Sequence, residues 1–225
     1  MRRIAAYCLT RNLYYDLIPA VNSLLYHDGA DLIYLIIEDD ALPYPLPPRC
    51  QVINAAQQPY FRNDGPNYGK YYTYMVLMRA ALTKLLPGAD RVLSLDVDTI
   101  VDGDISELWS IQLGTDLLAA APEPTREYLG GPYFQMGVVL FDLAQMRAEG
   151  VDDAIIADLN RIDYKFPEQD AINVHCFRRI RELDSRFNHN EYTKPTDDPR
   201  IYHFAGLRDW HRFPIVEKYR HLWKL

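Results

Sequence analysis

Short runs of apolar residues alternate with longer amphipathic segments through roughly the first hundred residues of this 225-residue chain. Helices are predicted at residues 17–27 and 71–86, and Pro87 with Gly88 marks the end of the second. The apolar runs outside these helices are predicted to be strands, at residues 3–10, 31–38, 51–54 and 91–95. Strands that alternate with helices in this way favour an α/β fold, in which helices cover a mainly parallel sheet.

The second half of the chain is less regular but continues the same pattern. Strands are predicted at residues 117–121 and 138–141, and helices at residues 151–159, 169–176 and 214–223. No internal repeat or long linker divides the chain. A content of 48% hydrophobic and 24% charged residues is typical of a folded globular protein. We therefore expect residues 1–225 to form one α/β domain.

Composition and charge exclude several classes of protein. The apolar runs are far shorter than the about 18 residues that a membrane-spanning helix needs, and no signal peptide is predicted. The net charge of −7 argues against a nucleic-acid partner, because such proteins carry a basic surface. The one basic cluster, residues 178–181, is interpreted as a solvated helix end. Three cysteines without a paired spacing indicate a reducing setting, and a cytoplasmic location is expected.

The strand at residues 91–95 runs directly into two aspartates, Asp96 and Asp98. In an extended chain, residues i and i+2 point to the same side, so both carboxylates face one place. That place lies at the carboxyl end of a strand, where open α/β sheets bind ligands. Two crowded carboxylates repel each other unless a proton or a cation lies between them. The pattern predicts a divalent metal site, with a polar turn as the alternative, and Asp102 and Asp104 are expected in the next turn and helix cap.

The same segment also resembles the nucleophile motif of haloacid-dehalogenase-like phosphatases, in which the first aspartate becomes phosphorylated. That family begins its chain with this strand, whereas 95 residues precede Asp96 here. No later acidic pair is plainly placed after a strand to hold the Mg²⁺ of such an enzyme. The phosphatase is therefore kept as a less favoured alternative.

Five segments, in order along the chain, carry a stronger resemblance. They are residues 9–15 (LTRNLYY), 96–98 (DVD), 133–143 (YFQMGVVLFDL), 168–170 (EQD) and 202–210 (YHFAGLRDW). Together they cover nearly the whole chain and resemble the retaining glycosyltransferases of family 8, the group of glycogenin and bacterial lipopolysaccharide galactosyltransferases. The resemblance implies a GT-A fold, which is a Rossmann-like nucleotide-diphospho-sugar transferase domain with a mainly parallel mixed sheet.

The first of these segments is similar to the family's nucleotide-binding turn. The resemblance implies that the uracil and ribose of the donor contact Leu9, Thr10, Asn12 and Tyr15. A tyrosine ring can stack on a base, and short polar side chains can bind its edge. The alternative is that Tyr14 and Tyr15 are core aromatic residues.

The resemblance extends to the aspartate motif and to the helix that precedes it. Arg79 matches an arginine that is implied to hold an acidic group or the diphosphate near the metal, with a surface helix position as the alternative. Asp98 is implied to chelate the cation with both carboxylate oxygens, and Asp96 to bridge the metal and the ribose. Val97, between them, is expected to contact the nucleotide.

Two segments of the second half are implied to lie beside the transferred sugar. Gln135 stands where the family's FNxGV segment has an asparagine that touches the donor sugar, so the identity of the sugar is open. Glu168 and Gln169 match the family's DQD, in which Glu168 replaces an aspartate. Both are expected to be catalytic, with Gln169 near the anomeric carbon. The alternative is that this segment only caps a helix after Pro167.

The last segment resembles the family's HxxGxxKPW ending. His203 would be the third protein ligand of the metal, and Gly206 would leave room for the diphosphate. Arg208 replaces the family's lysine and can offer a phosphate a forked set of donors, while Asp209 replaces the proline. Two carboxylates and an imidazole favour Mn²⁺ over Mg²⁺, because nitrogen ligation suits the softer metal.

These implications combine into one expected function. The chain is expected to be a metal-dependent transferase that moves a hexose, glucose or galactose, from a UDP-sugar to an acceptor hydroxyl with retention at the anomeric carbon. The acceptor is a saccharide, a lipid-linked molecule or a protein, and with 17 tyrosines the chain itself is a candidate. The main alternative is a non-catalytic nucleotide-sugar or carbohydrate-binding protein on the same fold, against which the complete set of metal ligands argues.

Overall fold

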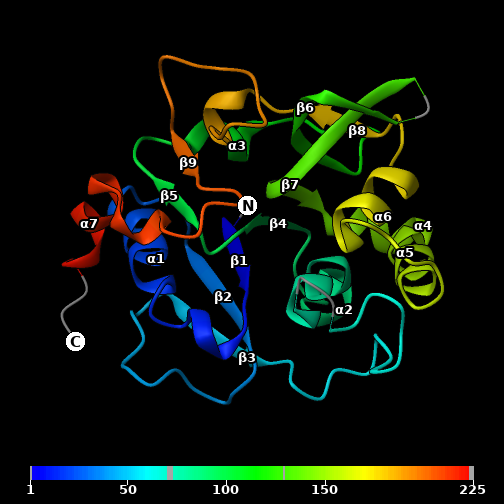
Figure 1. Ribbon diagram of the computed structural model, residues 1–225, viewed down its shortest axis with the longest axis horizontal. Helices are drawn as coiled ribbons and strands as arrows, with labels where there is room; N and C mark the ends of the chain where they lie inside the picture. The colour runs from blue at the N-terminus through cyan, green and yellow to red at the C-terminus, as the bar shows by residue number, and fades with distance from the viewer. Residues whose placement is uncertain (1, 70–72, 129, 223–225) are drawn as a thin grey trace.

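The computed structural model describes residues 2–69, 73–128 and 130–222, and a seven-stranded sheet runs through its centre (Figure 1). The strands of the first half are β1 (Ile4–Cys8), β2 (Leu32–Ile37), β3 (Cys50–Asn54) and β4 (Arg91–Leu95). Those of the second half are β6 (Leu118–Tyr128), β7 (Gly131–Asp142) and β8 (Ile180–Glu182). Their order across the sheet is β3-β2-β1-β4-β7-β6-β8.

Most neighbouring strands in this sheet are parallel. Strands β3, β2, β1 and β4 run the same way, and β8 is parallel to β6. The exception is β7, which is antiparallel to both β4 and β6. The α/β fold with a mainly parallel mixed sheet is therefore confirmed. Because β1 and β4 are parallel neighbours, their carboxyl ends meet at one edge of the sheet and can build a common site.

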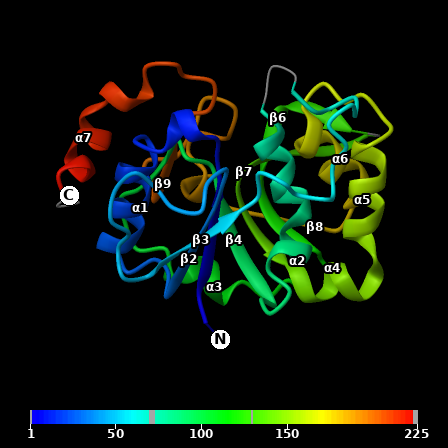
Figure 2. The same ribbon diagram turned by 90° about the horizontal axis from the view of Figure 1, so that it is seen from below.

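Helices cover both faces of the sheet (Figure 2). One face packs against α1 (Leu17–Tyr26) and α3 (Ser106–Ser110). The other packs against the 3₁₀ helix η2 (Tyr74–Ala81) and against α2 (Leu82–Leu85), α4 (Leu143–Glu149), α5 (Val151–Leu159) and α6 (Pro167–His175). Within the described part of the chain, no helix combines the length and the apolar character needed to cross a membrane.

Strand β1 is one of the strands that contribute to the cores on both faces. Ala5 and Tyr7 belong to the core beneath α1, whereas Ala6 belongs to the core beneath η2 and the later helices. All three are fully buried. A strand that is buried on both faces has a nearly continuous apolar sequence, which is why the sequence predicts β1 and β4 so directly.

Most predicted elements are confirmed, with small changes at their ends. β4 and α5 have the predicted bounds. The helix predicted at residues 71–86 is present as η2 followed by α2, and residues 71 and 72 lie outside the described residues. The predicted terminal helix is α7 (Pro214–Arg220), and residue 223 of that prediction also lies outside the described residues.

Several elements are not predicted from the sequence pattern. They include α4, β8 and a separate antiparallel pair formed by β5 (Thr99–Val101) and β9 (Ile201–His203). In that pair, Thr99 lies opposite His203, so the end of the chain returns to the segment that follows β4. The basic cluster at residues 178–181 lies in the turn after α6 and in β8, so its interpretation as a helix end is wrong.

Strands β6 and β7 form a long hairpin, whereas the sequence predicts two short strands at residues 117–121 and 138–141. The pairing within this hairpin is interrupted twice, at residues 136–138 of β7 and at residues 123–126 of β6. Bulges of this kind bend a strand, leave backbone groups without a ladder partner and re-aim the side chains. Both interruptions lie beside the cavity described below.

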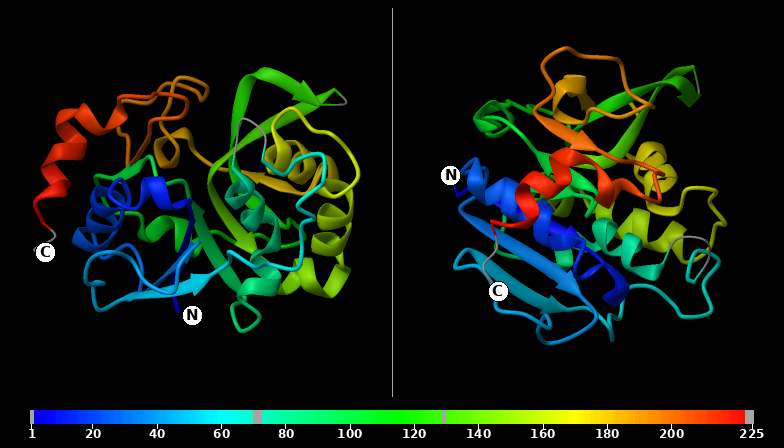
Figure 3. Two further views of the ribbon diagram at one scale, coloured as in Figure 1. Left: turned by 60° about the horizontal axis from the view of Figure 1, so that its bottom comes forward. Right: turned by 60° about the vertical axis from the view of Figure 1, so that its left-hand side comes forward.

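Helix α7 packs on α1 at the edge of the molecule (Figure 3). The side chain of Asn22 donates a hydrogen bond to the carbonyl of Tyr219 at 2.8 Å. Asp102 accepts hydrogen bonds from Lys218 at 2.6 Å and from the Tyr219 hydroxyl. Asp104 accepts a hydrogen bond from the N–H of Ser106, the first residue of α3, at 2.8 Å, although the N-cap position itself is Ile105. Asp102 instead connects the turn to α7.

Candidate active site

A cavity of about 680 Å³ opens at the carboxyl ends of β1 and β4. Cys8, Leu9 and Thr10 line it from the end of β1, and residues 96–98 line it from the end of β4. The start of α6 and the loop that follows β9 complete its walls. The volume lies within the range of about 300–1,000 Å³ that is typical of small-molecule sites. The position is the one at which open α/β sheets bind ligands.

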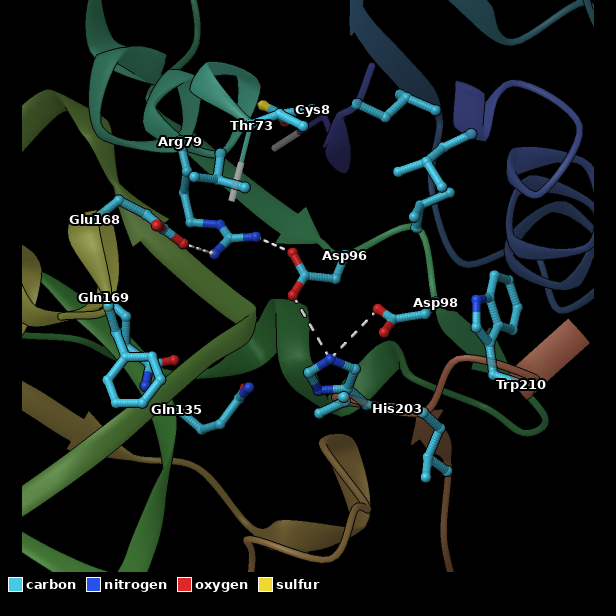
Figure 4. A pocket seen from close by; sticks show the side chains of 18 of the residues that line it. Cys8, Thr73, Arg79, Asp96, Asp98, Gln135, Glu168, Gln169, His203 and Trp210 are labelled. Atoms are coloured by element: carbon cyan, nitrogen blue, oxygen red, sulfur yellow. Dashed lines mark hydrogen bonds and ion pairs between the residues drawn. The ribbon is translucent and has the colours of Figure 1, made fainter. Parts of the chain in front are cut away.

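The three predicted metal ligands meet in this cavity (Figure 4). His203 Nε2 lies 3.5 Å from a carboxylate oxygen of Asp96 and 3.4 Å from one of Asp98. One ligand atom from each residue can be chosen so that all lie within 4.8 Å of one another. Two carboxylates and an imidazole that converge on one point are a donor set that fits a divalent cation.

Backbone hydrogen bonds hold these ligands in place. The N–H of Asp96 donates to the carbonyl of Gly137 on β7 at 2.8 Å, and the N–H of Phe204 donates to the carbonyl of Asp98 at 2.9 Å. The pairing of β5 with β9 carries His203 to the same point. The site therefore depends on three segments that are far apart in the sequence.

The protonation states of His203 and Asp96 depend on each other and on the charged groups around them. Burial works to lower the pKa of His203, but Asp98 and Asp96 outweigh it and raise that pKa. Burial works to raise the pKa of Asp96, but Arg79 and His203 outweigh it and lower that pKa. A proton on His203 therefore balances the carboxylates in the metal-free protein, and a cation that binds there must displace it.

Arg79 joins the metal-ligand cluster to the start of α6. Its guanidinium donates to Glu168 Oε1 at 2.8 Å, to the carboxylate of Asp96, and to Ser94 Oγ at 3.3 Å (Figure 4). Because Arg79 is only 7% exposed, the alternative of a surface helix residue is wrong. A planar fork of donors that holds two carboxylates at once is what a guanidinium offers and a lysine does not.

Glu168 lies in the first turn of α6 and is buried against Arg79. Burial raises the pKa of Glu168 to about 7, although the nearby Arg79 guanidinium acts in the opposite direction. The carboxyl group therefore changes its charge near neutral pH. A buried carboxyl group of this kind in a cavity is a frequent mark of a functional site.

Gln169 follows Glu168 in α6, and both the oxygen and the nitrogen of its side-chain amide form hydrogen bonds within the protein. Its Oε1 accepts from the N–H of Met136 at 3.0 Å, and its Nε2 donates to the hydroxyl of Tyr133 at 3.0 Å. Tyr133 in turn donates to Asp170 at 2.5 Å. The Met136 N–H is available for this bond because residues 136–138 have no regular partner on β6.

Gln135 lines the cavity from β7 and is also held by the protein. Its Oε1 accepts from the N–H of Gly137 at 2.6 Å and from Asn188 Nδ2 at 2.9 Å. Both lone pairs of the amide oxygen are therefore used within the protein. A ligand that contacts the side-chain amide of Gln135 therefore contacts its N–H groups rather than its oxygen.

Only two of the four residues predicted to contact the uracil and ribose line the cavity. Leu9 and Thr10 line the cavity, whereas Asn12 and Tyr15 do not belong to its lining. Asn12 Oδ1 accepts a hydrogen bond from the hydroxyl of Thr10 at 2.7 Å. Tyr15 is 60% exposed, and its ring centroid lies 5.7 Å from that of Tyr44. Tyr15 therefore lies on the surface, and the alternative interpretation of Tyr15 as a core residue is wrong.

The remaining predicted contacts, Val97, Gly206 and Arg208, all line the cavity. Gly206 has a φ of 76°, in the left-handed region that favours glycine. A Cβ added there would also lie 3.3 Å from the hydroxyl of Tyr192. The backbone at this position is thus open towards the cavity only because the residue is a glycine.

Sequence reasoning missed several residues that also line the cavity, namely Cys8, Asp16, Glu123, Arg126, Tyr192, Trp210 and His211. Glu123 and Arg126 lie in the interrupted part of β6 and form an ion pair at 2.8 Å. Pro122 and Pro124, on either side of Glu123, are the signal that could have indicated an irregular strand here.

Comparison with known sequences identifies the family. A family model described as Glycosyl transferase family 8 matches residues 37–213. The chain is also similar to a lipopolysaccharide 1,2-glucosyltransferase of Escherichia coli, with 29% identity over 162 residues that cover 58% of this chain and 48% of that protein. The chain spans about half the length of the curated relatives it matches.

Comparison with solved structures identifies the fold. The galactosyltransferase LgtC, solved with donor and acceptor sugar analogs, has a TM-score of 0.73 at 17% identity, covering 97% of this chain and 94% of that chain. The glycosyltransferase GlyE of Streptococcus pneumoniae has a TM-score of 0.74 at 18% identity, covering 98% and 60%. At these identities the likeness shows the fold alone, which is the predicted GT-A fold. Because the family model matches most of its residues, this chain belongs to glycosyltransferase family 8.

Proposed function

We propose that this protein transfers a hexose, glucose or galactose, from a UDP-sugar to an acceptor hydroxyl in a metal-dependent reaction that retains the configuration of the anomeric carbon. The observation that carries the proposal is the convergence of Asp96, Asp98 and His203 in a cavity that Arg79 and the start of α6 also line. Membership of the family supports glycosyl transfer. The use of a UDP-sugar donor, the dependence on a metal ion and the identity of the sugar are our proposals.

The diphosphate end of the donor is assigned to the metal ligands and to the loop after β9. Asp96, Asp98 and His203 would hold the cation, with Mn²⁺ preferred over Mg²⁺ because one ligand is an imidazole nitrogen. A bound divalent cation supplies positive charge where negative charge develops on the departing diphosphate. Arg208 adds a forked donor set at the cavity wall, and Gly206 lets the diphosphate approach the backbone.

The sugar end of the donor is assigned to Glu168 and Gln169, with Gln135 as a hydrogen-bond donor to a sugar hydroxyl. In the proposed reaction, the bond from the anomeric carbon to the diphosphate oxygen breaks and a bond to the acceptor oxygen forms on the same face of the sugar. The proton of the acceptor hydroxyl passes to the departing diphosphate. An amide is a weak nucleophile, so Gln169 is proposed to orient and stabilise rather than to form a covalent intermediate.

The nucleoside is assigned to Leu9, Thr10 and Val97, which line the cavity. Asn12 would act through Thr10, with which it shares a hydrogen bond. Tyr15 does not line the cavity, and its stacking on the base stays a prediction.

Three wider predictions accompany the proposal. Residues 1–225 are proposed to act as one catalytic domain. The acceptor is proposed to be a saccharide, a lipid-linked molecule or a protein hydroxyl. The cytoplasmic setting stays a prediction, which the free state of all three cysteines supports.

Thermal unfolding with UDP, with Mn²⁺ and with both tests the donor site. A ligand at a hundredfold excess over its dissociation constant stabilises the folded state by about 2.7 kcal/mol, which corresponds to a rise in Tm of about 5–10 °C for a chain of this size. We expect a rise of this size when UDP and Mn²⁺ are both present, and a smaller rise with Mn²⁺ alone. An unchanged Tm under all conditions would contradict the proposed donor site.

Incubation with a panel of UDP-sugars and acceptors then separates transfer from binding alone. We expect a product whose NMR coupling at the anomeric carbon matches that of the donor, because the reaction is proposed to retain configuration. Binding of UDP and Mn²⁺ without any product or donor hydrolysis would favour the non-catalytic alternative. Intact-mass analysis of the protein after the same incubation detects hexose units added to the chain itself.

A further inference from the structure

Asn188 lies fully buried between Gln135 and His203, at the end of the 3₁₀ helix η3 (Ser185–Phe187). We infer that Asn188 is a positioning residue, which holds the imidazole of His203 in the orientation and tautomer that leave Nε2 free to bind a cation. This inference rests on the proposed function, because it concerns the residue proposed as the third metal ligand.

A backbone N–H on β7 has a fixed role as a hydrogen-bond donor. The N–H of Gly137 lies 2.6 Å from the side-chain amide of Gln135. A backbone N–H can only donate, so the atom of Gln135 that faces it is the amide oxygen. The orientation of the Gln135 amide is thus set by the main chain of β7.

The same oxygen sets the orientation of Asn188. The amide of Asn188 approaches Gln135 Oε1 at 2.9 Å. Only a donor can face an acceptor in this way, so the atom that approaches is Nδ2. The other atom of the same amide, Oδ1, then lies 2.8 Å from His203 Nδ1.

The oxygen of Asn188 in turn decides which nitrogen of His203 carries the proton. Because Oδ1 has no proton to give, His203 Nδ1–H is the donor in this hydrogen bond. In the neutral imidazole the other nitrogen, Nε2, then has a free lone pair, and Nε2 is the atom that faces Asp96 and Asp98. A backbone N–H on β7 therefore selects the metal-binding tautomer through two side-chain amides.

Further hydrogen bonds keep Asn188 from turning. Asn190 Nδ2 donates to Asn188 Oδ1 at 3.0 Å, and the hydroxyl of Thr193 donates to the Asn188 carbonyl at 2.8 Å. A reversed Asn188 amide would bring its oxygen against Gln135 Oε1 and its N–H groups against the Asn190 amide nitrogen. Two favourable contacts would become two repulsive ones in a buried position, where an unsatisfied polar group is costly.

Binding of Mn²⁺ to the nucleotide-free protein, followed by electron paramagnetic resonance of the free ion, tests this role without any measurement of transfer. Asn188→Leu removes both hydrogen bonds at similar volume. Asn188→Asp keeps an oxygen for His203 Nδ1 and loses the bond to Gln135. The control is Asn67→Leu, because Asn67 is equally buried and its Nδ2 donates to the carbonyls of Leu159 and Ile162 at 2.7 Å each, outside the cavity lining.

We expect Asn188→Leu to weaken Mn²⁺ binding by about 10- to 100-fold, the usual cost of removing an outer partner of a metal-binding histidine. Asn188→Asp is expected to retain most of the Mn²⁺ affinity of the unaltered protein, and Asn67→Leu is expected to leave that affinity unchanged. Thermal unfolding of each variant in the absence of metal shows that the compared proteins are folded.

Unchanged Mn²⁺ affinity in Asn188→Leu would overturn the inference while leaving the metal site intact. An equal loss of affinity in Asn67→Leu would also overturn it, because general destabilisation would then explain both. Absence of Mn²⁺ binding by the unaltered protein would overturn the metal site and this inference together. The failure of the inference and the failure of the proposed function are therefore distinguishable.

Discussion

The imidazole of His203 lies directly against the main chain of Gly137, so that a Cβ added at Gly137 would meet ring atom Cε1 at 2.0 Å. The same glycine accepts a hydrogen bond from the N–H of Asp96 and donates one to Gln135. One residue of β7 therefore touches two of the three proposed metal ligands. Glycine is required here for space rather than for an unusual backbone conformation.

Gly137→Ala is expected to lower the free energy of unfolding and to weaken Mn²⁺ binding. The added methyl group cannot fit without moving the His203 ring, and overpacking of this kind costs about 1–3 kcal/mol. Urea unfolding and Mn²⁺ titration measure the two effects. Gly88→Ala is the control, because a Cβ at Gly88 meets no atom within 4 Å. An alanine at position 137 with unaltered stability and Mn²⁺ affinity would contradict the close contact.

Asp98→Asn is expected to abolish the joint stabilisation by UDP and Mn²⁺ and to reduce transfer below detection. The substitution keeps the shape of the side chain and removes a charge that the proposed cation needs. The metal-free protein should remain folded, because Asp98 makes its side-chain contact with His203 rather than with the core. Thermal unfolding with and without both ligands gives the comparison. A fully active Asp98→Asn protein would refute the metal assignment.

Glu168→Gln is expected to change how stability depends on pH. Because burial raises the pKa of Glu168 to about 7, the folded protein binds this proton more tightly than the unfolded chain does. The resulting stabilisation is complete below the ordinary glutamate pKa of about 4.5 and is lost as the pH rises through about 7. The shift corresponds to a loss of about 3 kcal/mol between these limits.

Urea unfolding of the metal-free protein at several values of pH between 4.5 and 8 measures this dependence. The free energy of unfolding of the unaltered protein should fall over this interval by more than that of Glu168→Gln. Two parallel curves would show that Glu168 has an ordinary pKa in the folded state.

Tyr133→Phe is expected to lower kcat while leaving the KM for the donor nearly unchanged. The hydroxyl of Tyr133 accepts from Gln169 and donates to Asp170, so its removal frees the amide that is proposed to lie near the anomeric carbon. A hydrogen bond worth about 1 kcal/mol corresponds to a fall in rate of about fivefold. Tyr34→Phe, in β2 away from the cavity, is the matched control. A rise in KM alone would indicate that Tyr133 acts on binding.

Much of the first half of the fold can be predicted because its strands are buried on both faces. β4 is mostly apolar, with Arg91 at its start and Ser94 within it, and the change to Asp96 marks its end. The position of Asp96 and Asp98 in the cavity then follows from the general rule that α/β sheets bind ligands at the carboxyl ends of their strands.

The second half is harder to predict because its local pattern is broken at the functional residues. Residues 131–137 contain Pro132, Gln135 and Gly137, which do not read as a buried strand, yet they belong to β7. This irregular part of β7 is held by hydrogen bonds to side chains of α6 and of the segment around Asn188. Such long-range contacts leave no periodic pattern in the sequence from which they could be predicted.

The interruption at residues 136–138 has a consequence for how the length of this chain can vary. Deletion of these residues would remove the first of the two breaks in the pairing of β6 with β7, since Ala120 pairs with Val139 and Ala121 with Gln135. The repaired hairpin would have a more regular ladder but would lack the backbone groups that hold Asp96, Gln135 and Gln169. Insertions and deletions that surface loops tolerate are therefore excluded at this point, where a more regular sheet would lose the contacts that hold the proposed site.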